Sequence, residues 1–176
     1  MILRPLELDG SFLVEVEPAE DQRGFYAQSY SAREFNDHGL AASFVEGGIS
    51  HNARRGTIRG MHMQLEPHAQ AKLIRCTRGA IHDVIIDLRD GSPTRGRWVS
   101  VDLSPSEMKL LYVPEGFAHG FQTLADDAEV TYQLSDYYDP EAEFGVRWND
   151  PRFGIDWPID EVVISDRDRS FPDFEG

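Results

Sequence analysis

The sequence is poor in cysteine and lysine and has no long apolar run. Cys76 is the only cysteine among 176 residues, so no disulfide can form within the chain, and we expect a reducing, cytoplasmic environment. No apolar run reaches the roughly 18 residues that a membrane span needs, so no membrane partner is expected. The start of the chain, Met1 to Pro5, lacks the pattern of a signal peptide. These absences favour a globular protein that is not exported.

Positive charge is also scarce, and it is unevenly distributed. The formal net charge is −14, which argues against a nucleic-acid partner because an acidic protein repels the phosphate backbone. Residues 51–78 are the exception, since six basic side chains there accompany a single acid, Glu66. This cationic segment predicts either a solvated basic surface or a pocket for a small anion.

The length and the turn pattern indicate one all-β domain covering residues 1–176. Turn signals rich in glycine and proline separate short segments with strand character. We expect strands at 12–16, 24–30, 44–50, 56–64, 72–77, 80–88, 97–103, 109–113, 120–124 and 129–134. One short helix is expected at Ser31–His38, with Ser31 as its N-cap and Gly39 at its end. This spacing predicts a β-sandwich or barrel, on which the part of the chain from about residue 136 packs.

The segment Gly56–Gln64 contains the first candidate site residues. As a regular strand it would place Arg59 and His62 on opposite faces, unless Gly60 forms a bulge that turns one of them. Lys72 is one of only two lysines and opens the next expected strand. It is either an edge residue that protects against aggregation or a residue of a site.

Two later strands supply a histidine and a tyrosine. His119 follows a tight turn at Pro114–Gly116, and it is either a hydrogen-bonded core histidine or a residue that projects into the mouth of a barrel. Tyr132 is expected to share one face of its strand with Val130. It is either a core residue with a bonded hydroxyl group or a catalytic acid.

The histidines also raise the question of a metal ion. Metal-binding cupins carry His-x-His followed by Glu, with a later His. This chain instead has His62-Met-Gln64 with Glu66 as the only nearby acid, so two of those ligands are weakened or missing. We therefore expect no metal and no other cofactor, and a metal-binding cupin is the less favoured alternative.

Together these motifs resemble the dTDP-4-dehydrorhamnose 3,5-epimerase family, a metal-independent branch of the cupins. The resemblance runs from Asp21 to Asp168 and depends on the order and spacing of the motifs. The matching segments are residues 21–25, 56–62, 70–72, 91–94, 114–121, 132, 138, 143–145, 148–151 and 165–168. It implies a cupin-type jelly roll, a β-sandwich barrel with a few short helices, which forms a homodimer by exchanging N-terminal strands.

The family implies inversion of C3, C5 or both in a nucleotide-linked 4-keto-6-deoxy sugar, whose protons at these carbons are acidic because each carbon lies next to the ketone. By resemblance, His62 is the base, Asp168 its partner and Tyr132 the acid on the opposite side of the sugar. Lys72 would stabilise the enolate oxygen. The same resemblance assigns Arg59 and His119 to the sugar diphosphate and Tyr138 to the nucleobase. The further binding positions that it implies are Arg23, Gln28, Glu46, Gly48, Glu143 and Arg167.

The binding residues depart from the family pattern, whereas the acid–base set is intact. Gln28 stands where the family usually has Glu, and Glu46 and Gly48 stand where it has Gln and Asn. A single-centre epimerase or ketoisomerase acting on another nucleotide sugar is therefore one alternative. A non-catalytic cupin that binds a sugar nucleotide is the other; the altered binding residues favour it slightly, and the retained acid–base set argues against it.

Overall fold

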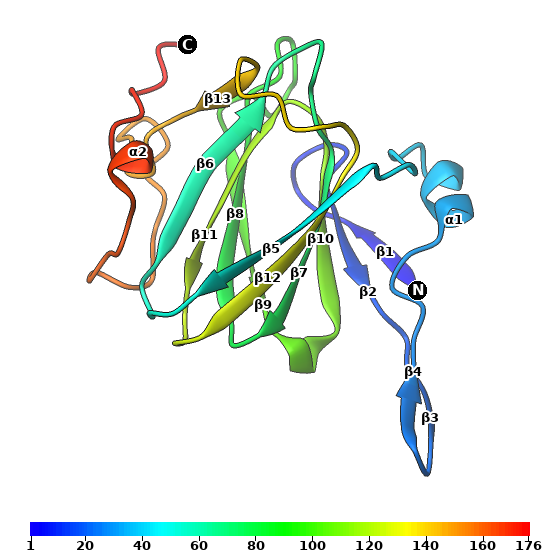
Figure 1. The fold of residues 1–176 in the computed structure, drawn as a ribbon. Helices are drawn as coiled ribbons and strands as arrows, with labels where there is room; N and C mark the ends of the chain where they lie inside the picture. The colour runs from blue at the N-terminus through cyan, green and yellow to red at the C-terminus, as the bar shows by residue number, and fades with distance from the viewer.

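The computed structural model describes residues 1–176 as two antiparallel β-sheets packed face to face (Figure 1). The six-stranded sheet contains, in order, β1 (Ile2–Pro5), β2 (Phe12–Glu15), β10 (Lys109–Val113), β7 (Lys72–Arg78), β12 (Ala128–Leu134) and β5 (Glu46–Asn52). The five-stranded sheet contains, in order, β13 (Glu143–Gly145), β6 (Ile58–Gln64), β11 (Phe117–Thr123), β8 (Ile81–Asp87) and β9 (Trp98–Leu103). This jelly-roll sandwich confirms the predicted fold class.

The remaining elements are short and lie outside the two sheets. They are the hairpin of β3 (Ala19–Asp21) and β4 (Gly24–Tyr26), the helices α1 (Ala32–Asp37) and α2 (Asp166–Arg169), and the 3-10 turn η1 (Pro105–Glu107). The predicted helix is confirmed, with Ser31 as its N-cap: the Ser31 hydroxyl group accepts a hydrogen bond from the Glu34 backbone N–H. None of the helices is long and apolar enough to cross a membrane.

The expected strands are present, with some ends displaced. The strand predicted at 24–30 is wrong beyond Tyr26, and the one predicted at 120–124 begins earlier, at Phe117. Three short strands, β1, β3 and β13, were not predicted. Every residue of β3 and β4 is exposed, so that hairpin has no alternation of buried and exposed positions for a sequence pattern to reveal.

Apolar clusters fill the space between the sheets and cover both outer faces. The inner cluster includes Ile74, Phe117 and Phe121. The outer face of the six-stranded sheet packs against the α1 region through Phe35. The outer face of the five-stranded sheet packs against the chain after β12, where Trp98 donates to the Phe153 carbonyl at 2.8 Å. Both sheets are therefore held rigidly, which positions the side chains at the open end of the sandwich.

Candidate active site

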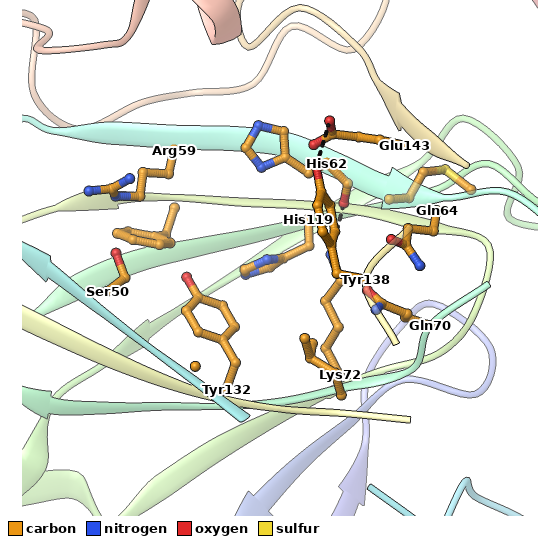
Figure 2. Close-up of a pocket in the computed structure, with 14 residues that line it drawn as sticks. Ser50, Arg59, His62, Gln64, Gln70, Lys72, His119, Tyr132, Tyr138 and Glu143 are labelled. Carbon is orange, nitrogen blue, oxygen red and sulfur yellow. Dashed lines mark hydrogen bonds between the residues drawn. The ribbon is translucent and has the colours of Figure 1, made fainter. Parts of the chain in front are cut away.

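A pocket of about 300 Å³ opens between the two sheets (Figure 2). One wall is the five-stranded sheet, from which Arg59, His62 and His119 face the pocket. The opposite wall is the six-stranded sheet, which supplies Lys72 and Tyr132. The pocket therefore brings together basic and acid–base side chains from two separate sheets.

An irregularity at Gly60 lets Arg59 and His62 share this pocket. In the pairing of β6 with β11, His62 lies opposite His119 and Arg59 lies opposite Phe121. Two residues of β6 therefore face the single residue Gly120, as in a bulge. Gly60 has φ +140°, and a Cβ there would lie 2.5 Å from the Gly120 Cα, so no side chain fits. The bulge is the alternative left open by the sequence, and the structure selects it.

His62 and Asp168 form a direct pair although they are 106 residues apart in the chain. The His62 Nε2 atom lies 2.9 Å from the Asp168 Oδ1 atom, and the second carboxylate oxygen accepts from the Gly60 N–H. Burial works to raise the pKa of Asp168, but the His62 hydrogen bond and charge, the Gly60 N–H and Arg167 together lower it. Asp168 therefore stays ionised and leaves His62 Nδ1 as the ring nitrogen available to a ligand.

The His62 ring also packs against the C-terminal segment. The Phe171 ring meets it edge-on at a centroid distance of 5.5 Å. Gly145 makes room for Phe171, since a Cβ at that position would lie 2.5 Å from the Phe171 ring. The segment that carries Asp168 thus encloses the His62–Asp168 pair on its outer side.

Lys72 is a buried residue of an inner strand, so the alternative of an edge lysine is wrong. It lies on β7, between β10 and β12, and its ammonium group donates to the His62 carbonyl at 3.0 Å. Burial lowers the pKa of Lys72 to about 8, and the charge of Asp83 opposes that shift. The pocket therefore contains a poorly solvated positive charge.

His119 and Tyr132 lie close to Lys72 in the depth of the pocket. The His119 Nε2 atom is 2.6 Å from Asp83 Oδ1, and the His119 and Tyr132 rings meet edge-on at 6.1 Å. Burial lowers the pKa of His119, so a neutral imidazole is favoured over the cation. Burial and the charge of Asp83 raise the pKa of Tyr132, so its hydroxyl group keeps its proton. Tyr132 shares its inward face with Val130, as predicted.

Arg59 lies at the mouth of the pocket, where a hydrogen bond to Asn52 holds its side chain. Its Nε atom donates to the Asn52 side-chain oxygen at 2.7 Å. Asn52 is itself buried and donates to the carbonyls of Ser50 and Ala128. The Arg59 Nη2 atom also lies 3.5 Å from the His51 carbonyl oxygen, so the guanidinium group is oriented from one edge and keeps N–H groups for an anionic ligand.

The predicted binding residues Tyr138, Glu143 and Gly48 lie on the pocket wall. The Tyr138 ring is half exposed, its hydroxyl group is 3.4 Å from a Glu143 carboxylate oxygen, and Arg167 forms an ion pair with Glu143. Glu46 lies behind this wall and accepts from the Tyr138 backbone N–H at 2.8 Å. Its carboxylate therefore fixes the backbone of Tyr138 and does not line the pocket.

Two predicted binding residues lie away from the pocket in this chain. Arg23 belongs to the β3–β4 hairpin, which projects from the sandwich, and its side chain pairs with Asp21 (Figure 1). Gln28 is exposed in the segment that follows the hairpin. Neither residue reaches the pocket of its own chain, because residues 19–28 extend outward from the sandwich, and their assignment to substrate binding stays a prediction.

Several pocket residues were not predicted from the sequence. Gln64 and Gln70 line the pocket, and Asp83 lies beneath it, bonded to His119. A signal for Asp83 was present, since it is one of two aspartates in a predominantly apolar segment at 80–88. No group of three or more histidine, cysteine or carboxylate side chains is placed to hold a metal ion.

A β-sandwich with a histidine–carboxylate pair facing a tyrosine and a buried lysine defines a cupin-type acid–base site. The comparisons agree with this class, since a profile of the dTDP-4-dehydrorhamnose 3,5-epimerase family matches residues 5–176. The chain therefore belongs to the dTDP-4-dehydrorhamnose 3,5-epimerase family and is an enzyme of the isomerase class.

Individual relatives support the same assignment. A dTDP-4-dehydrorhamnose 3,5-epimerase from Methanothermobacter thermautotrophicus is 41% identical over 93% of this chain and 89% of its own length. A dTDP-4-dehydrorhamnose 3-epimerase from Streptomyces niveus is 38% identical over 96% of this chain and 82% of its own. A crystal structure of the 3,5-epimerase from Bacillus anthracis, with TDP and PPi bound, has a TM-score of 0.94 at 40% identity and covers 98% of this chain and 99% of that one.

Proposed function

We propose that this enzyme inverts C3 and C5 of a dTDP-linked 4-keto-6-deoxyhexose through an enolate. The observation that carries the proposal is the placement of His62 and Tyr132 on opposite walls of one pocket. A base and an acid that flank the sugar ring can remove a proton from one face and return one to the other. The names of the relatives supply the nucleotide and the sugar.

In the proposed mechanism, His62 Nδ1 takes the proton from the carbon next to the ketone. The electron pair of the broken C–H bond moves into a new C–C double bond, and the ketone oxygen becomes negative. The Asp168 carboxylate holds the ring through Nε2 and stabilises the imidazolium that forms. Lys72, whose ammonium group is buried beside His62, stabilises the enolate oxygen as it develops.

Inversion is completed from the opposite wall. The Tyr132 hydroxyl group keeps its proton because burial raises its pKa, so it can donate to the opposite face of the enolate carbon. The resulting phenolate regains a proton from water, and the His62 imidazolium releases its proton to water, which restores both groups. Arg59 binds the diphosphate, and Tyr138 stacks on the nucleobase at the half-exposed rim.

Proton exchange in heavy water tests this function. With dTDP-4-keto-6-deoxyglucose as substrate, we expect the wild-type enzyme to incorporate solvent deuterium at both C3 and C5, measured by NMR. Label at C3 alone would assign the enzyme to the single-centre class, as in the relative from Streptomyces niveus. Binding of the substrate without label at either carbon contradicts the proposed reaction and supports the non-catalytic alternative.

We further propose that the enzyme works as a homodimer in which the N-terminal segment of one copy completes the pocket of the other. β5 forms the edge of the six-stranded sheet next to the pocket, and its Ile49 side chain is 74% exposed. The projecting hairpin also exposes Phe25 and Tyr26. An uncovered strand edge and a hairpin with two exposed aromatic side chains are complementary, and their contact would bring Arg23 to a pocket.

Substitution of Ile49 tests the dimer. We expect Ile49→Glu to convert the dimer to a monomer in light scattering, because the new carboxylate would be buried without a partner. Leu65→Glu is the matched control: Leu65 is also a large exposed apolar residue, at 45% exposure, and lies outside β5. A wild-type monomer, or a dimer that tolerates Ile49→Glu, contradicts this arrangement.

A further inference from the structure

A buried carboxylate lies beneath the pocket, and no step of the proposed mechanism uses it. Asp83 is on β8, and its side chain is fully buried. The apolar residues Ile81, Val84, Ile85 and Ile86 of the same strand are also fully buried. Because a buried charge is costly unless it is paired, apolar packing alone would favour an aliphatic side chain at position 83.

The contacts of Asp83 are directed toward the pocket. Oδ1 lies 2.6 Å from the Nε2 atom of His119, whereas Oδ2 is buried without a hydrogen-bond partner. An ionised carboxylate only accepts, so the His119 Nε2 atom must carry the hydrogen. A neutral His119 then presents Nδ1 as an acceptor to a ligand. Asp83 therefore selects which tautomer of His119 faces the pocket.

Lys72 is the buried positive group whose charge the Asp83 carboxylate stabilises. It is 92% buried, and its one protein hydrogen bond goes to the His62 carbonyl, which leaves donor capacity on the ammonium group. Burial lowers its pKa to about 8, and the negative charge of Asp83 opposes the shift. The other ionisable groups around this compartment are His62, His119, Tyr132 and Arg59. Tyr138 and Glu143 also line the pocket, and Asp168 lies behind His62. Glu143 pairs with Arg167 and Asp168 with His62, whereas one oxygen of the buried Asp83 carboxylate has no partner, so Asp83 is the carboxylate left to stabilise the charge of Lys72.

We propose that Asp83 is a positioning residue of the site: its buried carboxylate holds His119 as the Nε2–H tautomer and keeps Lys72 charged. The inference rests on the proposed epimerase function for its catalytic consequence, because a charged Lys72 is what stabilises the enolate. Its structural part, the charge state of Lys72 and the tautomer of His119, is independent of any substrate.

The scarcity of lysine makes a direct test possible. Protein labelled with ¹³C and ¹⁵N only in lysine gives side-chain signals from two residues, Lys72 and the surface residue Lys109, and Lys109→Arg assigns them. In the wild type, we expect Lys72 to titrate with a pKa of about 8. In Asp83→Asn, which keeps an acceptor for His119 but removes the charge, the pKa of Lys72 should fall by about 1 or more.

The matched control is a second buried aspartate of the same strand. Asp87 is also fully buried, but it is held by Arg89, Ser92 and Thr94 and does not line the pocket. Asp87→Asn should lower the stability of the protein and leave the Lys72 titration unchanged. An unchanged titration in Asp83→Asn, with the variant folded, overturns the proposal.

Two further measurements separate this inference from the proposed function. If Asp83→Asn fails to fold, ¹⁵N-histidine NMR of the wild type still tests the proposal, since a His119 Nδ1–H tautomer contradicts the role of Asp83.

If the wild type turns over substrate, the pH–rate profile of Asp83→Asn should lose activity at a lower pH on its basic side. The rate at pH 8 should fall about fivefold, because a smaller fraction of Lys72 is charged. If the wild type shows no exchange activity, the proposed epimerase function is contradicted, but the lysine and histidine NMR results on Asp83 still stand.

Discussion

His62→Ala should lose at least about 1,000-fold in the rate of deuterium incorporation at C3 and C5, because the variant has no base to remove the proton. The structure gives His62 the features of such a base: a carboxylate at 2.9 Å on one ring nitrogen and an open pocket at the other. The measurement is NMR of substrate incubated in heavy water, with folding checked by circular dichroism. Full exchange in His62→Ala would show that the base is another residue.

The matched control is a second histidine–aspartate pair outside the pocket. His82 Nδ1 lies 2.7 Å from Asp102 Oδ1 on the outer side of the five-stranded sheet, near Trp157. His82→Ala removes a similar pair and should leave the exchange rate per folded enzyme within about twofold of the wild type. The contrast separates a catalytic histidine from a loss of stability shared by both variants.

Tyr132→Phe should separate proton removal from inversion. The variant keeps His62 and its partner Asp168, so deuterium should still enter the substrate, with the enolate reprotonated on the face from which it was formed. Inversion should fall by about 100-fold or more, because no donor is left on the opposite wall. The ratio of labelled starting material to inverted product, followed by NMR over time, is therefore the informative quantity.

Tyr112→Phe is the control for removal of a buried hydroxyl group. Tyr112 lies on β10 of the same sheet, and its hydroxyl oxygen accepts from the Ala41 N–H at 2.8 Å, away from the pocket. Its loss should cost about 1 kcal/mol of stability and leave the ratio of exchange to inversion unchanged. If Tyr132→Phe lowers exchange and inversion equally, Tyr132 does not act as the acid of the proposed mechanism.

Local patterns in the sequence predicted much of the fold. Alternation placed Lys72 with Ile74 and Tyr132 with Val130, and each pair faces inward. The cap at Ser31 set the start of α1. These predictions succeeded because period-two alternation and helix capping depend only on neighbours within a few residues. β3 and β4 were poorly predicted because an exposed hairpin has no buried face to constrain its residues.

The sequence by itself determined the all-β class, the cationic segment and the set of residues with acid–base chemistry. Only the tertiary structure decided how they meet. At Gly60 the β6 backbone passes close to Gly120 and forms a bulge. The bulge rotates the strand so that the Arg59 and His62 side chains both face the same pocket. Asp168 reaches His62 across 106 residues, and Asp83 on β8 meets His119 on the neighbouring strand β11. Such contacts depend on the register and packing of distant strands, which no local spacing encodes.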